Sequence, residues 1–288
     1  MRKNKKLAVT IFLIIVALLV LLPLIVTVTN SFMRSSEINE SYGAFIGDST
    51  TQDKKEKFRS IKLIPDNIVI EQYYEVLVGK SKFLRMFWNS VFLALPIVIF
   101  QTIISSSAAF VFAKIKFRGR DTLFFIYIII MMMPFQVTLV PNYLVLDKLG
   151  ILDNYLSIIL PGIFGAFGVF LLRQFMISIP NEYIEAAMVD GCSLAQIFFK
   201  VILPQSKGGV ASLAILLFID NWNMVEQPLI FLKDVNKHPL SIYLSVINSS
   251  ELGIAFAASV IYMIPALLVF LYGQNYLIEG ISNSTIKK

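Results

Sequence analysis

The sequence predicts an all-α integral membrane protein, a single transmembrane domain over residues 1–288 with six membrane-spanning helices. Hydrophobic residues make up 57% of the chain and charged residues only 15%, far from the balance of a soluble domain. Six apolar runs are each long enough to cross roughly 30 Å of hydrocarbon as a helix. These runs lack strand-like alternation, and backbone groups in lipid must be satisfied within the segment, so helices are expected.

The first expected span, residues 7–28, follows a basic N-terminus in the charge order of a signal peptide. Its length of about twenty apolar residues and the lack of a small-residue cleavage pattern favour a retained membrane anchor. The other expected spans are residues 88–113, 122–143, 156–177, 209–232 and 252–276.

The fourth expected span contains three glycines at intervals of three residues, Gly162, Gly165 and Gly168, preceded by Pro161. Small residues let neighbouring helices approach closely in a membrane, and proline permits a bend. The sequence therefore predicts close helix packing along this span.

Basic residues set the expected orientation, because positively charged loops remain on the cytoplasmic side. Four precede the first span and four follow the second, whereas the loop after the third offers only Lys148. We therefore expect cytoplasmic N- and C-termini in a multi-pass plasma-membrane protein. The formal net charge of +6 is explained by such loops, and no nucleic-acid partner is expected. The eight residues are Arg2, Lys3, Lys5, Lys6, Lys114, Lys116, Arg118 and Arg120.

Residues 30–86 form the one long polar stretch and are expected to be an outer loop. Its nine basic and eight acidic residues nearly cancel, and residues 67–79 have the pattern of a short amphipathic surface helix. The run Gly79-Lys80-Ser81 resembles the end of a phosphate-binding loop, but Tyr74 stands where such a loop needs glycine. Nucleotide binding at this point is therefore not expected.

Cysteine and histidine, two residue types common in metal sites and active sites, each occur once in the chain. Cys192 is the only cysteine and His238 the only histidine, so an internal disulfide and a cysteine-based zinc cluster are impossible within the chain. No Ser–His pair or carboxylate cluster lies at membrane depth, as an intramembrane enzyme would require. We expect no catalytic residue, no metal site and no enzymatic activity in this chain.

Residues 178–208 contain two short amphipathic helices in a stretch expected to be cytoplasmic. Ile184, Ala187, Met188 and Gly191 fall on one face of the first helix, and Asp190-Gly191 is a turn signal. Ser193 and Gln196 have capping-box spacing at the start of the second helix, whose apolar side carries Leu194, Ile197, Phe198, Val201 and Ile202 before Pro204. The apolar faces either pack on the protein itself or the membrane surface, or insert into a groove of a partner.

The same stretch carries a family resemblance. Glu185-Ala186-Ala187, three residues, Gly191, nine residues and then Val201-Ile202-Leu203-Pro204 resembles the "EAA" signature of permease subunits of binding-protein-dependent ABC importers. Residues 131–155, 167–180 and 221–223 resemble the carbohydrate-uptake branch, in particular the smaller permease of maltose-type systems. Trp222-Asn223-Met224-Val225 departs from the Trp-Asn-Asp-Phe that is frequent there.

The resemblance implies a type I ABC importer permease fold with a cytoplasmic coupling-helix loop at residues 178–208. It implies a bacterial or archaeal plasma membrane and a heterodimer with a second permease, two ATPase subunits and an extracytoplasmic sugar-binding protein. No cofactor is expected on this chain, because ATP and Mg are bound by the ATPase subunits. The expected ATPase-coupling residues are Glu185, Ala186, Ala187, Asp190, Gly191, Leu203 and Pro204.

Polar residues near the end of the fifth span are costly in lipid, so they are expected to line the pore or to contact the receptor or second permease at the outer surface. The alternatives to a sugar permease are an importer of another solute, or an ATPase-independent transporter or channel. The sequence identifies neither the solute nor whether this chain contacts it. The polar stretch comprises Asp220, Asn221, Trp222, Asn223, Glu226 and Gln227.

Overall fold

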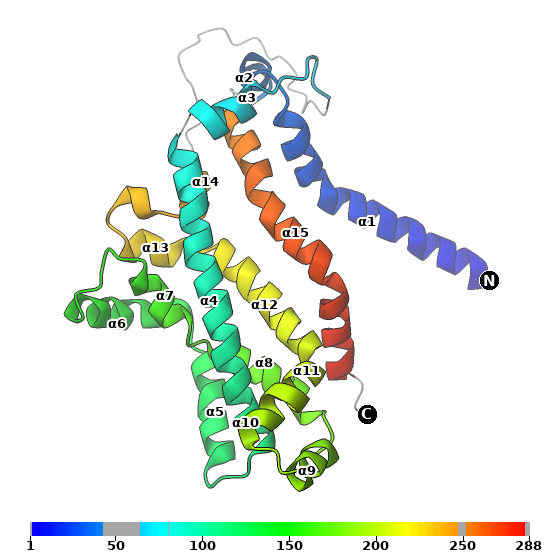
Figure 1. Cartoon of the computed structure of the whole chain (residues 1–288). Coiled ribbons are helices and arrows are strands. Elements are labelled where there is room, and N and C mark those ends of the chain that lie inside the picture. The colour runs from blue at the N-terminus through cyan, green and yellow to red at the C-terminus, as the bar shows by residue number, and fades with distance from the viewer. Residues whose placement is uncertain (1, 43–63, 80, 247–251, 286–288) are drawn as a thin grey trace. The chain divides into compact units, whose positions relative to one another are not determined.

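A computed structural model describes residues 2–42, 64–79, 81–246 and 252–285, and within these ranges every regular element is a helix (Figure 1). Four described helices are long and apolar enough to cross a membrane, or up to six spans if each of two bent helix pairs counts as one. The all-α prediction is confirmed. The chain divides into two compact units, residues 1–85 with 243–264 and residues 86–242 with 265–288.

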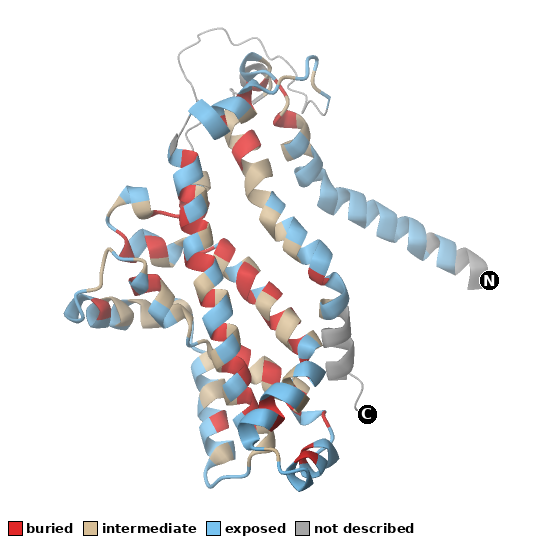
Figure 2. Ribbon diagram, viewed as in Figure 1, coloured by how far each residue is buried: buried red, intermediate tan, exposed pale blue. Residues whose placement is uncertain are grey.

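The first unit contains α1 (Arg2–Asn30), α2 (Ser35–Tyr42), α3 (Glu71–Tyr74) and the π-helical turn η2 (Glu75–Gly79). It also holds the first residues of α4 (Ser81–Lys114), the end of α14 (Leu240–Ser245) and the first part of α15 (Leu252–Thr285). The apolar side chains of α1 are exposed along most of its described length (Figure 2), as expected of a helix that meets lipid or another subunit.

Helical structure within the expected outer loop packs against the end of α1. The Val69 amide donates to the Phe32 carbonyl at 2.9 Å, and the hydroxyls of Ser31 and Tyr73 are 2.7 Å apart. Gln72 donates to the Met33 carbonyl. The helix expected over residues 67–79 is therefore present from Glu71 to Gly79, although α4 begins at Ser81, five residues before the expected loop ends.

The second unit contains the rest of α4 and α15 and the elements between them. In chain order these are α5 (Arg120–Met131), α6 (Phe135–Lys148), α7 (Leu156–Gly162), α8 (Ala166–Ile177), α9 (Glu182–Val189), α10 (Leu194–Ile197), η3 (Phe198–Ile202), α11 (Leu203–Gln205), α12 (Lys207–Trp222), α13 (Glu226–Phe231) and η4 (Val235–Lys237).

The expected third span, residues 122–143, is wrong as a single continuous helix. It is divided between α5 and α6, which are bent by 98° at residues 132–134 (Figure 1). Pro134 lacks an N–H group and has an extended ψ of 139°, so the helical hydrogen bonds cannot run through it. Residues 122–143 are apolar enough for one span, but their backbone changes direction.

The expected fifth span, residues 209–232, is also wrong as one helix. Helix α12 ends at Trp222, and the polar residues that follow lead into the separate short helix α13. The side-chain amide of Asn223 donates to the Ile219 carbonyl at 2.7 Å and so satisfies one of the free carbonyls at the end of α12.

The glycines of the fourth span make the expected close contacts with α4. A Cβ atom added at Gly162 would lie 3.0 Å from Ile97, one at Gly165 would lie 1.7 Å from the amide of Gln101, and one at Gly168 would lie 2.4 Å from the Ser105 hydroxyl. The chain leaves helical structure between Gly162 and Ala166, so α7 and α8 are separate helices within this span.

Two apolar cores hold the second unit together. One joins α4, α8 and α12 to the helices of residues 178–208, through buried residues such as Phe110, Leu172 and Leu213. The other joins α4, α6, α7 and α13 through Ile97, Ile158 and others. Two features of the second unit bear on function: the helices of residues 178–208 and a cavity.

Candidate functional site

The first feature is the helix-pair segment, residues 178–208. Helix α9 ends at Val189, with Asp190 as its C-cap. Beyond it, the Cys192 amide donates to the Ala187 carbonyl and the Gly191 amide donates to the Met188 carbonyl, both at 3.0 Å. Gly191 has a φ of +78°, a left-handed conformation that costs glycine little. The helix ends at the glycine turn, as the sequence predicts.

The second helix of this segment begins with the predicted capping box. The Ser193 amide donates to Gln196 Oε1 at 2.8 Å, and the Gln196 amide donates to the Ser193 hydroxyl at 3.3 Å. The helix then passes through the π-helical turn η3 and continues to Gln205, one residue beyond the predicted exit at Pro204, and the following helix α12 is bent away by 77°.

The inner face of the segment packs on the protein's own helices. Ile184 and Ala187 of α9 are buried with Ile197, Phe198 and Ile202 in the core that includes α4, α8 and α12. Two members of the expected apolar face, Met188 and Gly191, are instead exposed, as is Leu194 of the second helix. The buried residues of the expected faces therefore attach the helix-pair segment to the rest of the protein.

The outer face of α9 is a different stripe of residues. Glu182, Glu185, Ala186 and Val189 recur at i, i+3, i+4 and i+7, which places them on one side of the helix, and all four are exposed. Val189 is 88% exposed, an unusual state for a valine with no covering chain. We call these four residues the outer stripe.

A lysine ties the start of the helix-pair segment to the end of α4. Lys114 Nζ donates to the Ile179 carbonyl and, at 3.0 Å, to the side-chain oxygen of Asn181. The segment is thus attached both through its buried face and through this pair of hydrogen bonds. A force applied to the segment would therefore reach α4 directly.

The expected coupling residues divide between these faces. Glu185, Ala186, Asp190, Gly191 and Pro204 are exposed, whereas Ala187 is buried and Leu203 is half-buried. Only the first group is accessible to another chain.

The second feature is a cavity of about 760 Å³ within the second unit. It lies where three expected spans are interrupted, between α5 and α6, between α7 and α8, and beyond the end of α12. Non-helical backbone at membrane depth is tolerated where it is buried in protein or lines a cavity. The polar residues on the cavity wall are Gln101, Thr138, Asn142, Asp220, Asn221 and Gln227.

Some of the residues expected to line the pore or face the receptor lie on the cavity wall, and others do not. Asn221 and Gln227 line the cavity together with Asp220, whereas Asn223 and Glu226 do not. Glu226 accepts hydrogen bonds from Gln136 at 3.2 and 3.3 Å. Trp222 is a core residue, 1% exposed and stacked on Phe218 with ring centroids 5.4 Å apart.

Sequence reasoning missed three cavity residues, Gln101, Thr138 and Asn142. Gln101 lies in a strongly apolar run, where a lone polar residue is expensive and is itself a signal of function. Thr138 and Asn142 follow the break at Pro134, and the assumption of one continuous helix concealed the surface that they share.

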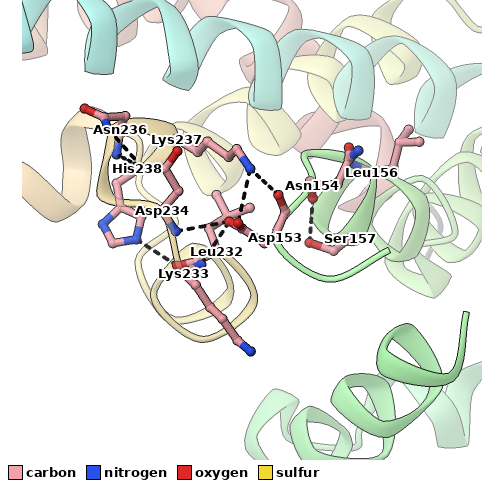
Figure 3. Close-up of polar contacts among 10 residues, drawn as sticks. All are labelled: Asp153, Asn154, Leu156, Ser157, Leu232, Lys233, Asp234, Asn236, Lys237 and His238. Atoms are coloured by element: carbon pink, nitrogen blue, oxygen red, sulfur yellow. Dashed lines mark hydrogen bonds and ion pairs between the residues drawn. The ribbon is translucent and has the colours of Figure 1, made fainter. Parts of the chain in front are cut away.

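Apart from these two features, a cluster of polar side chains joins the loop after α6 to the loop after α13 (Figure 3). Asp153 Oδ1 accepts the backbone amides of Lys233 and Asp234 at 3.1 and 3.0 Å, and Asp153 Oδ2 lies 3.2 Å from Lys237 Nζ. The hydrogen bond from the Asp234 amide lowers the pKa of Asp153 against partial desolvation, with Lys237 adding to the effect.

His238 belongs to the same loop as this cluster. Its Nε2 is 2.9 Å from the Leu232 carbonyl, and the side chain is buried. Among the described residues, no group of three or more His, Cys, Asp and Glu side chains is placed to hold a metal ion. The cluster of Asp153 and its partners is therefore a structural tie between two loops.

Fold and site together describe a multi-pass membrane subunit with a helix pair built onto its own core and one exposed face on that pair. Residues 101–282 match the family of binding-protein-dependent transport system inner membrane components, and the chain belongs to that family.

Curated relatives match over nearly the whole chain. The chain is 28% identical to the arabinooligosaccharides transport system permease protein AraQ of Halalkalibacterium halodurans, over 96% of this chain and 95% of the relative. It is 29% identical to the sn-glycerol-3-phosphate transport system permease protein UgpE of Brucella abortus (strain 2308), over 83% and 89%.

Among solved structures, the chain superposes on a bacterial ABC transporter involved in the import of the acidic polysaccharide alginate, with a TM-score of 0.80 and 25% identity. The superposition covers 96% of this chain and 98% of the other. The fold is therefore that of a type I ABC importer permease.

Proposed function

We propose that this chain is the membrane-spanning permease subunit of an ATP-driven, binding-protein-dependent carbohydrate importer. Family membership and relatives named for arabinooligosaccharide and alginate transport support this function. The chain forms half of the translocation pore in a heterodimer with a second permease. Two ATPase subunits bind ATP and Mg at the cytoplasmic side, and an extracytoplasmic sugar-binding protein delivers the solute.

The proposed mechanism depends on the helix-pair segment having one buried face and one exposed face. Its inner face is embedded in the core of α4, α8 and α12, while the outer stripe is uncovered. A short exposed helix of this kind fits the helix-in-groove mode of recognition. Movement of an ATPase groove would push the segment, and the shared core and Lys114 would pass the displacement to the transmembrane helices.

The residues of the outer stripe suit an ATPase groove. Ala186 permits close approach of the partner's backbone, and Val189 supplies apolar contact area. Glu185 and Glu182 give the stripe a negative charge, which favours a groove lined with basic groups. Gly191 sets the end of α9, and Pro204 lies in the turn before the 77° bend into α12.

Two single substitutions, one at an exposed and one at a buried position of α9, test this assignment. Val189→Asp should leave folding unchanged, because the side chain is 88% exposed, yet abolish co-purification of the ATPase subunits. Ile184→Ala should lower the free energy of unfolding by about 2–4 kcal/mol, because it empties a buried site. Co-purification from detergent and thermal unfolding of each variant provide the measurements.

Charge reversal at Glu185 supplies a second arm of the same test. Glu185→Lys should weaken ATPase binding, and the loss should diminish at high salt because the interaction is between exposed charges. Unchanged ATPase recovery in both Val189→Asp and Glu185→Lys would contradict docking on the outer stripe. Full transport without any ATPase would instead favour an autonomous transporter.

A further inference from the structure

The wall of the cavity in the second unit carries three amide side chains from separate helices. They belong to Gln101 on α4, Asn142 on α6 and Gln227 on α13. Each amide offers two N–H donors and one carbonyl acceptor. Three amides from three different elements therefore converge on one space of about 760 Å³, a size typical of small-molecule sites.

Gln101 is the most informative of these residues. Only 5% of it is exposed and it lines the cavity, so water or a ligand in the cavity must replace the contact that its amide loses with bulk water. The space for this amide exists because position 165 is glycine, since a Cβ there would lie 1.7 Å from Gln101 Nε2. The break between α7 and α8 thus accommodates a polar side chain at the cavity wall.

The charge of the cavity wall restricts the kind of ligand. Among the described residues that line it, none is Lys, Arg or His, and the only ionisable carboxylate is Asp220. An anion bound there would find no cation of this chain to pair with and would be repelled by Asp220. Amides, one hydroxyl and apolar surface suit a ligand with many neutral hydroxyl groups.

We propose that this cavity binds a neutral carbohydrate and that Gln101 is a specificity-determining contact within it. The proposal rests on the proposed function and makes it more specific, because relatives carry names for both neutral and anionic solutes. It also assigns direct solute contact to this chain. Asp220, with no cation among this chain's lining residues, disfavours phosphorylated and acidic sugars.

The test uses the complete transporter, with its second permease, ATPases and receptor, in proteoliposomes. Cys192→Ser removes the only native cysteine of this chain, so a single thiol can be introduced at Thr138 on the cavity wall. Val137→Cys is the control, because Val137 is adjacent, 59% exposed and outside the cavity lining. Arabinotriose and sn-glycerol 3-phosphate serve as the neutral and anionic probes of uptake and of thiol labelling.

We expect ATP-driven uptake of arabinotriose and slower labelling of the Thr138→Cys thiol in its presence, with no protection by sn-glycerol 3-phosphate. Labelling of the Val137→Cys thiol should not respond to either probe. Gln101→Met retains the length of the side chain without its amide, and should raise the half-protecting arabinotriose concentration about three- to tenfold, the effect of losing one hydrogen bond.

Two further variants separate a binding role from a packing role. Gly165→Ala should raise the half-protecting concentration in the same direction, because the new Cβ displaces the flexible end of Gln101. Thr102→Val, next to Gln101 and outside the cavity lining, should leave the concentration unchanged. Uptake of arabinotriose with no protection at position 138, or with no effect of Gln101→Met, would overturn the inference.

The remaining outcomes distinguish this inference from the proposed function. ATP-driven uptake of sn-glycerol 3-phosphate without uptake of arabinotriose would overturn the neutral-carbohydrate site and leave an ATP-driven importer. ATP-independent uptake, or uptake of neither probe, would overturn both the site and the proposed carbohydrate importer.

Discussion

Gly191 shows how one residue fixes the geometry of the helix-pair segment. Its φ of +78° is strained for residues with a Cβ, while nothing lies within 4 Å of the position that a Cβ would take. Gly191→Ala should therefore lower the free energy of unfolding by about 1 kcal/mol through backbone conformation alone. Gly191→Asn should cost less, because asparagine tolerates this conformation better. Equal unfolding midpoints for wild type and Gly191→Ala would contradict this explanation.

Asp153 gives the tie between the loops after α6 and α13 a pH dependence. The hydrogen bond from the Asp234 amide lowers its pKa, so its stabilising contribution is complete above the unfolded pKa of about 4 and is lost as pH falls through the lower folded value. We expect the unfolding midpoint to decrease between pH 5 and pH 2.5. The decrease should be smaller in Asp153→Asn, which cannot ionise, and identical profiles would rule out this role.

At the scale of elements, the contact between α8 and α12 depends on a glycine. A Cβ at Gly209 would lie 2.6 Å from the ring of Phe175, and a ring in a packed interface cannot move aside as a flexible side-chain end can. Gly209→Ala should lower the free energy of unfolding by roughly 1–3 kcal/mol. Phe175→Leu in the same chain should restore part of the loss in a thermal unfolding experiment, and a neutral Gly209→Ala would contradict the close packing.

The elements that sequence predicts well are those fixed by local chemistry. The Ser193–Gln196 capping box and the turn at Gly191 are present because their signals act within a few residues. Hydropathy identifies apolar surface but does not determine the path of the backbone, so it does not predict the bend before α6, which lies at Pro134. The sequence also does not show which face of α9 is buried. Both faces include apolar residues, and burial depends on helices that are distant in the chain.

The candidate site was predictable to the same extent. The resemblance to the importer signature implies Glu185, Ala186 and Gly191 as coupling residues, and the structure adds that Glu182 and Val189 share the exposed side with the first two. The cavity could not be assembled from sequence, because its polar wall comes from α4, α6, α12 and α13. Only tertiary structure brings residues so distant in the chain together.

At the scale of the whole molecule, the chain is a membrane subunit of a binding-protein-dependent transport system, and we propose that it converts movement of ATPase partners into opening of a solute path. The apolar surface left exposed on its helices is consistent with lipid and a second permease as neighbours (Figure 2). In the proposed function, the helix-pair segment would connect that assembly to ATP hydrolysis through the outer stripe.

The most direct test is uptake of arabinotriose by proteoliposomes that contain the complete transporter and receptor, with ATP and Mg supplied on the ATPase side. We predict uptake that requires ATP hydrolysis and is lost in Val189→Asp, while that variant inserts and folds normally. Uptake that continues without ATP, or that is undiminished in Val189→Asp, would contradict ATP-driven transport through the outer stripe.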